Sequence, residues 1–129
     1  VKSIDIDFVC NDFLYFDFSS ITADDFIYCD PPYLISTGAY NDGKRGFKGW
    51  SESEEYQLLA MLEDFDKNGI RFALSNVLLH KGKTNHILID WISRHNFKVA
   101  HLKKNYAASS YHTSDRNKNG SDEVLIMNY

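Results

Sequence analysis

An acidic group, two rigid rings and a flat aromatic face occur in four consecutive residues: Asp30, Pro31, Pro32 and Tyr33. They follow the apolar run 26–29, which predicts a short buried strand. Each residue before a proline is pushed to an extended conformation, and each proline ring fixes its own φ. Because proline lacks the N–H group that a strand ladder needs, the strand must end here. The sequence therefore predicts a rigid strand end that presents a carboxylate, free carbonyl groups and an aromatic ring. In open α/β sheets, ligands bind at this edge.

The residues after this motif predict a helix and a strand. Ser51 and Glu54 form a capping box, and Gly69 suits the end of a helix. The residues expected on the buried face of this helix are Tyr56, Leu58, Leu59, Leu62 and Phe65. Residues 70–74 follow as a strand, and residues 75–76 are expected to close it at the same edge as the acidic motif.

Three more strands and a second helix complete the predicted fold. Strands are predicted at residues 4–9, 98–102 and 123–128, and a polar loop at residues 80–85. Residues 85–95 predict an amphipathic helix. Its inward-facing residues are expected to be Ile87, Leu88, Trp91 and Ile92. Because helices and strands alternate over the middle of the chain, the fold class is α/β.

The composition fits one globular domain without a strong electrostatic field. Hydrophobic residues make up 43% of the 129 residues and charged residues 25%, which is ordinary for a globular chain. The net charge is −4, from 14 basic and 18 acidic residues, so no overall positive field attracts nucleic acid. Cys10 and Cys29 are far apart and are expected to be reduced, buried thiols of a cytosolic protein. The five histidines lack ligand spacing, so no metal site is predicted, and no signal or membrane-spanning segment is recognised.

Several short segments stand in the order found in the Dam-type DNA adenine-N6 methyltransferases. They are Asp30 to Tyr33, Tyr40-Asn41, Phe47, the helix from Ser51, Gly69, residues 74–77 and residues 122–126. From Phe8 onward the chain resembles that family, and most of all its restriction-modification members that methylate adenine in GATC. The resemblance implies a partial Rossmann-like methyltransferase fold, with a mostly parallel sheet and a terminal antiparallel hairpin. It also implies an enzyme of the bacterial or phage-infected cytoplasm that methylates the N6 amino group of adenine in double-stranded DNA.

The resemblance assigns a role to each residue of the acidic motif. Asp30 and the backbone carbonyl of Pro31 would accept hydrogen bonds from the adenine amino group, and thereby stabilise the charge that develops on it. Tyr33 would stack on an adenine flipped out of the duplex. Pro31 and Pro32 would keep these groups rigid, which favours correct orientation of the reacting atoms.

The resemblance also implies a cofactor, S-adenosylmethionine, and residues beside it. Asp12 would act as an acceptor and Phe13 as an apolar wall, with Asp30 at the methionine end of the cofactor. An alternative for Asp12 stays open, because an acidic residue after a strand is also a helix cap. In that alternative Asp12 caps a short helix over residues 13–18.

Two long polar segments are expected to contact DNA. Residues 34–50 contain several glycines and a basic run, and residues 103–121 interleave basic residues with tyrosines. The residues expected to bind DNA are Tyr40, Asn41, Lys44, Arg45, Lys48, Arg116 and Lys118. The alternative for both segments is a solvated surface loop.

The chain is expected to be part of a longer protein. Family members carry, near the amino terminus, a Phe-x-Gly motif that cradles the cofactor and then a DNA-recognition insert, and neither precedes the acidic motif here. Residues 1–129 are therefore predicted to be the carboxyl-terminal part of a catalytic domain, which needs the amino-terminal half of the same enzyme. Two alternatives remain: a non-catalytic fragment or relic, and a methyltransferase of RNA or protein glutamine. Because relatives of the latter kind usually begin the motif with asparagine, Asp30 argues against them.

Overall fold

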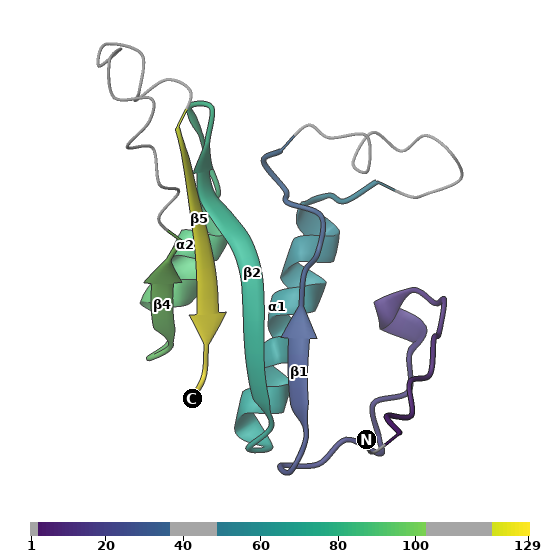
Figure 1. The fold of residues 1–129 in the computed structure, drawn as a ribbon. Coiled ribbons are helices and arrows are strands. Elements are labelled where there is room, and N and C mark those ends of the chain that lie inside the picture. The colour runs from purple at the N-terminus through teal and green to yellow at the C-terminus, as the bar shows by residue number, and fades with distance from the viewer. Residues whose placement is uncertain (1–2, 37–48, 103–119) are drawn as a thin grey trace.

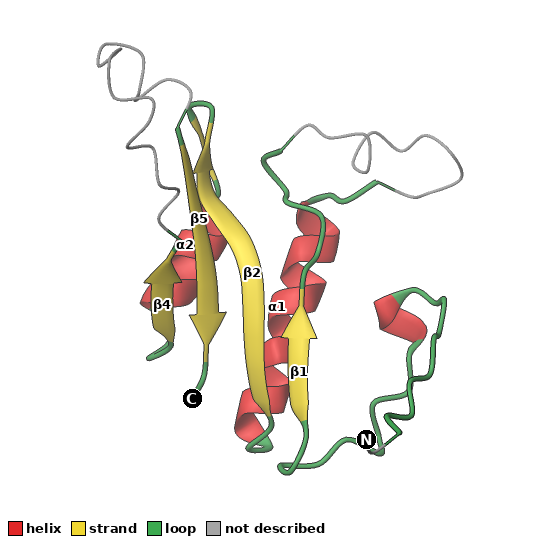
Figure 2. Ribbon diagram, in the orientation of Figure 1, coloured by secondary structure: helices red, strands yellow, loops and turns green. Residues whose placement is uncertain are grey.

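The computed structural model describes residues 3–36, 49–102 and 120–129. These residues form a mixed α/β fold in which two helices lie behind an open sheet (Figure 1). The elements in chain order are a 3-10 helix η1 (Phe13–Tyr15), β1 (Phe26–Cys29), α1 (Glu52–Lys67), β2 (Arg71–His80), β3 (Lys83–Thr84), α2 (His86–Ser93), β4 (Lys98–His101) and β5 (Ser121–Met127). Figure 2 distinguishes the helices, strands and loops by colour.

The described strands form one sheet in the order β1, β2, β5, β4, and the short β3 pairs with β2. β1 runs parallel to β2, whereas β5 is antiparallel to both β2 and β4, and β3 is antiparallel to β2. The pairing of β4 with β5 confirms the expected antiparallel hairpin. The expectation of a mostly parallel sheet is wrong for the described strands, because β5 inserts in the reverse direction between β2 and β4.

Helix α1 forms where its local signals predicted it. Ser51 is the N-cap, and its backbone N–H donates to the Glu54 carboxylate at 2.8 Å. This bond satisfies a backbone donor that the helix itself cannot pair. The helix ends at Lys67, and Gly69 follows with a φ of 71°, a left-handed conformation that glycine adopts without strain.

One hydrophobic core lies between the sheet and the two helices, which both lie on one face of the sheet (Figure 1). Its buried residues include Leu58, Leu59, Leu62, Phe65, Phe72, Leu74, Leu88, Trp91, Val124 and Ile126. Tyr56 was predicted to join them but is 56% exposed. The reason is that Glu55, one turn before Leu59, occupies the inward position instead. None of the described helices is long and apolar enough to cross a membrane.

Helix α2 is shorter than the predicted span and begins at a side-chain cap. The Asn85 side chain accepts a hydrogen bond from the Leu88 backbone N–H at 3.0 Å. Leu88 and Trp91 are buried as predicted, whereas Ile87 and Ile92 are only partly buried against the core. An asparagine cap that is itself buried fixes the start of α2 against the rest of the core.

Strand β2 continues well past its predicted end and reaches His80. Ser75 and Asn76 do not close the strand but stay in the ladder with β5. A two-residue turn, Lys81-Gly82, then reverses the chain into β3. The prediction of a polar loop at residues 80–85 is therefore wrong in part, because His80 of β2 and the residues of β3 pair with each other in the sheet.

The strand predicted at residues 4–9 is not present in the described structure. The segment is exposed, with Phe8 at 93% and Ile4 at 81%, and no described strand lies alongside it. Among the described strands, β1 has no partner on its outer edge, and Phe26 and Tyr28 are 51% and 60% exposed. Apolar alternation indicated a strand, but a strand also needs a neighbour to pair with its backbone groups.

Candidate active site

The acidic motif lies at the carboxyl end of β1, beside the middle of β2. Cys29 pairs with Leu74 in the last pair of the parallel ladder between β1 and β2. Asp30 is the next residue of its chain segment, as Ser75 is on β2. Asp30 is exposed, and its side chain makes no hydrogen bond or ion pair with any other described residue. Its carboxylate is therefore open to a ligand at the edge where open α/β sheets bind them.

The Tyr33 ring is half-buried and is tied to β2. Its hydroxyl lies 3.3 Å from the Ser75 hydroxyl, and its backbone carbonyl accepts from the Ser36 N–H at 3.1 Å. Pro31 is half-buried and Pro32 is exposed. The motif residues therefore lie together at one edge of the sheet, as predicted. The contact with Ser75 on β2, which was not predicted from the sequence, restrains the Tyr33 ring.

A buried carboxylate lies beneath this edge. The Glu55 side chain is fully buried and accepts three hydrogen bonds. The donors are Trp50 Nε1 at 2.7 Å, Asn76 Nδ2 at 3.2 Å and Asn85 Nδ2 at 3.1 Å. An unpaired carboxylate would be very costly there, so the three donors are what permits its burial. We call these four residues the Glu55 network.

The Glu55 network joins parts of the chain that are far apart in sequence. It connects the segment entering α1, the first turn of α1, the middle of β2 and the cap of α2. Sequence reasoning missed it, although one signal was available: Glu55 lies at core spacing before Leu59 in an otherwise apolar stripe. An acid at such a position needs buried partners, and here they hold α1, β2 and the start of α2 together.

Asp12 is a helix cap, as in the alternative interpretation. Its carboxylate accepts from the Leu14 backbone N–H at 3.0 Å, at the start of the short helix η1. Phe13 packs against Trp50, with 5.7 Å between ring centroids, and so contacts the Glu55 network. The capping bond uses one carboxylate oxygen, and the proposed cofactor roles of Asp12 and Phe13 stay predictions.

The two cysteines differ in environment. Cys10 is exposed, so the prediction of a buried thiol is wrong for it, because the segment around it packs against no described strand. Cys29 is partly buried in β1, and this burial raises the pKa of its thiol to about 11. Cys29 therefore stays protonated at neutral pH.

The residues predicted to bind DNA lie outside the described part of the chain. They are Tyr40, Asn41, Lys44, Arg45, Lys48, Arg116 and Lys118. Within the described ranges, no group of three or more histidine, cysteine or acidic side chains could hold a metal ion.

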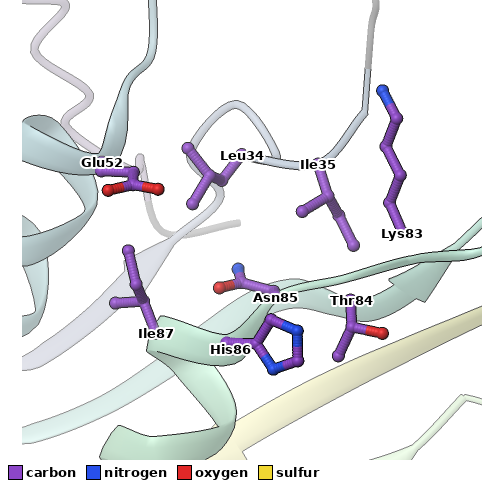
Figure 3. A pocket seen from close by; sticks show the side chains of 8 residues that line it. All are labelled: Leu34, Ile35, Glu52, Lys83, Thr84, Asn85, His86 and Ile87. Atoms are coloured by element: carbon purple, nitrogen blue, oxygen red, sulfur yellow. The ribbon is translucent and has the colours of Figure 1, made fainter.

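A pocket of about 270 Å³ opens beside the motif (Figure 3). Leu34 and Ile35, which follow Tyr33 directly, line it on one side. Glu52 contributes from the start of α1, and β3 with the first turn of α2 completes the lining. This pocket could not be predicted from the sequence, because its lining comes from three separate segments.

The chain is similar in sequence to known DNA methyltransferases. Residues 1–115 match the family described as D12 class N6 adenine-specific DNA methyltransferase. The chain is 51% identical over 129 residues to "Modification methylase StsI" of Streptococcus sanguinis, covering 100% of this chain and 19% of that protein. It is 48% identical over 124 residues to "Type II methyltransferase M.FokI" of Planomicrobium okeanokoites, covering 96% of this chain and 18% of that protein. "Modification methylase LlaI" of Lactococcus lactis subsp. lactis is 53% identical over 83 residues, covering 64% of this chain and 13% of that protein.

The chain thus spans about a fifth of the length of the first two of these relatives. The family match covers most of the chain and includes the whole acidic motif, the network beneath it and the pocket beside it. The chain belongs to the D12 class N6 adenine-specific DNA methyltransferase family.

Proposed function

We propose that this chain forms part of an enzyme that transfers a methyl group from S-adenosylmethionine to the N6 amino group of adenine in duplex DNA. The observation that carries the proposal is the exposed Asp30 carboxylate beside a restrained Tyr33 ring, at the carboxyl end of β1. Membership of the adenine-specific family supports the same reaction, and the relatives named as modification methylases support a restriction-modification context.

Asp30 accepts a hydrogen bond from the adenine amino group in this proposal. The nitrogen lone pair is delocalised into the ring, so the amino group is a poor nucleophile. Acceptors aimed at its two N–H bonds favour tetrahedral geometry and stabilise the positive charge that develops on nitrogen. Asp30 is one acceptor and the Pro31 carbonyl is the other. Because Asp30 is exposed and unpaired among the described residues, it is available for this contact.

Tyr33 provides the surface on which the flipped adenine rests. An adenine that leaves the duplex loses its stacking energy, and a flat aromatic face recovers part of it. The contact between the Tyr33 and Ser75 hydroxyls limits rotation of the ring, so the ring is oriented before the base arrives. Such preorganisation lowers the entropic cost of reaching a reactive geometry.

The described residues fit one side of the cofactor. When bound, S-adenosylmethionine supplies an electrophilic methyl group on a positively charged sulfur. Phe13, held against Trp50, offers an apolar wall, and Asp30 offers a carboxylate. Asp12 keeps one carboxylate oxygen outside its capping bond, which can accept from a further donor.

The rest of the enzyme is proposed to complete the sheet and the cofactor site. β1 ends the described sheet with an unpaired edge and exposed aromatic side chains, Phe26 and Tyr28. An edge of this kind is a template for another strand. In this proposal the chain is the carboxyl-terminal part of a catalytic domain, and the amino-terminal half pairs with that edge. The GATC target and the cytoplasm of a bacterial or phage-infected cell remain predictions.

The family match favours adenine in DNA over RNA or a protein glutamine as the methyl acceptor. The test uses the full-length protein with S-adenosylmethionine that carries a labelled methyl group. Duplex DNA, RNA and a glutamine peptide are offered separately, and the digested DNA is analysed for N6-methyladenine. A duplex with 2-aminopurine in place of adenine, which lacks the 6-amino group, is the control. Label in cytosine, or in the RNA or peptide alone, would contradict the proposal.

A further inference from the structure

The hairpin that joins β2 to β3 presents two exposed lysines past the carboxyl end of β2, the end of the sheet toward which β1 and the motif also run. His80 pairs with Lys83, so Lys81 and Gly82 alone form the turn. Their φ values are 48° and 77°, the left-handed pair that suits the twist of a tight hairpin. Lys81 and Lys83 make no ion pair with other described residues. The hairpin therefore holds two uncompensated positive charges in a fixed position.

The pocket connects this hairpin to the motif. Leu34 and Ile35 leave the motif and form its apolar side, Lys83 lies beside Ile35, and His86 lies across from both (Figure 3). Figure 3 shows the Lys83 side chain extending past Ile35, with its ammonium group directed away from Asn85. The pocket therefore has an aliphatic side, formed by the residues that follow the motif, and a cationic group beside it.

The size and charge of the pocket indicate the class of ligand. Pockets that enclose drug-sized molecules measure roughly 300–1,000 Å³, so about 270 Å³ suits a smaller unit than a whole cofactor. The charged or titratable groups that line it are Lys83, His86 and Glu52, and the Lys81 ammonium lies on the adjoining turn. Glu52 and Lys83 lie on opposite sides of the pocket (Figure 3). A phosphate therefore fits at the lysine side, away from the Glu52 carboxylate, and its sugar can pack on the aliphatic carbons.

We propose that Lys81 and Lys83 bind the phosphate backbone of the DNA strand that carries the target adenine, and that the pocket receives a neighbouring sugar-phosphate unit. This inference rests on the proposed function. The hairpin lysines would be a DNA contact within the described fold, in addition to the DNA-binding residues predicted from the sequence. The contact is independent of base sequence, so it positions the strand beside Asp30 and does not select the site.

The chain offers matched control residues at the opposite end of the sheet. Lys67 ends α1, and Lys98 begins β4, which runs in the same direction as β2. Both are exposed lysines far along the elements from the motif. They carry the same charge as the hairpin lysines, so they separate a local contact from an effect of net charge.

The test uses the full-length enzyme and the variants Lys81→Asn, Lys83→Gln and the double variant. Asparagine tolerates the left-handed conformation of the turn, and glutamine keeps most of the length of lysine. Binding to a duplex oligonucleotide is measured over a range of salt concentrations. Each lost phosphate contact should reduce the slope of log K against log[salt] by about 1, so the double variant should lose about 2. In the hairpin variants, KM for DNA should rise with little change in kcat. Lys83→Arg keeps the positive charge and should bind DNA as the wild type does.

The controls and the wild-type protein distinguish the ways in which the inference can fail. Lys67→Gln and Lys98→Gln should leave the salt slope and KM unchanged, and circular dichroism should show that all variants are folded. If the hairpin variants behave like these controls while the wild type methylates DNA, the inference is wrong and the proposed function stands. If the wild-type full-length protein neither binds nor methylates duplex DNA, both are wrong.

Discussion

Tyr33→Phe tests how the aromatic surface is held. The substitution keeps the ring for stacking but removes the hydroxyl that lies 3.3 Å from the Ser75 hydroxyl. If this contact orients the ring, its loss should reduce the rate modestly, because the stacking surface itself remains. A much larger effect would mean that the hydroxyl contributes directly to the reaction.

The expected magnitude follows from the geometry. A typical O–H···O bond measures about 2.7–2.8 Å, so a separation of 3.3 Å is long. We therefore expect the lower part of the range for a neutral hydrogen bond, about 0.5–1 kcal/mol, or about two- to fivefold in kcat/KM. Tyr33→Ala also loses stacking, about 1–3 kcal/mol. Its total of about 1.5–4 kcal/mol corresponds to a loss of roughly tenfold to several hundredfold.

The assay is methyl transfer by the full-length enzyme to a duplex oligonucleotide, measured as kcat/KM. Ser75→Ala should cost about as much as Tyr33→Phe, and the double variant should cost no more than either single change. The reasoning is refuted if Tyr33→Phe is as damaging as Tyr33→Ala. It is also refuted if the losses from Ser75→Ala and Tyr33→Phe simply add.

Three further outcomes are expected. Glu55→Gln places an amide N–H₂ against either the Trp50 indole N–H or the buried asparagine amides, so it should destabilise the folded enzyme by about 1–3 kcal/mol; an unchanged thermal midpoint would contradict this. The 129 residues alone should bind S-adenosylmethionine weakly or not at all and should self-associate through the open edge of β1. Tight binding in a calorimetric titration, or a monomer in sedimentation, would contradict this. At pH 8 a thiol reagent should modify exposed Cys10 well before Cys29, whose pKa is raised to about 11 by burial, and equal rates would contradict this.

Elements with local signals could be predicted from the sequence. The capping box at Ser51 and the glycine after Lys67 define α1, because both act through backbone groups within a few residues. The strand that ends before Asp30 was predicted for the same reason, since the two prolines stop it locally. The placement of the acidic motif at the sheet edge followed from these signals.

Features that depend on distant neighbours could not be predicted. β2 extends to His80 because β5 pairs with it, although Ser75 and Asn76 in its middle are polar. Residues 4–9 have a strand pattern but no described strand to pair with. The donors of Glu55 come from three separate segments, and no spacing in the sequence brings them together. In each case tertiary pairing decides the outcome, and local pattern does not.

The most direct test of the central claim compares Asp30→Ala with the wild type in the full-length enzyme. Loss of an acceptor that acts mainly in the transition state should cost about 3 kcal/mol or more, which is at least about 100-fold in kcat. DNA affinity should change far less, since the contact contributes little to ground-state binding. Asp24→Ala, in the exposed turn that precedes the same strand, is the matched control and should retain full activity. Near-normal methylation by Asp30→Ala would contradict the account.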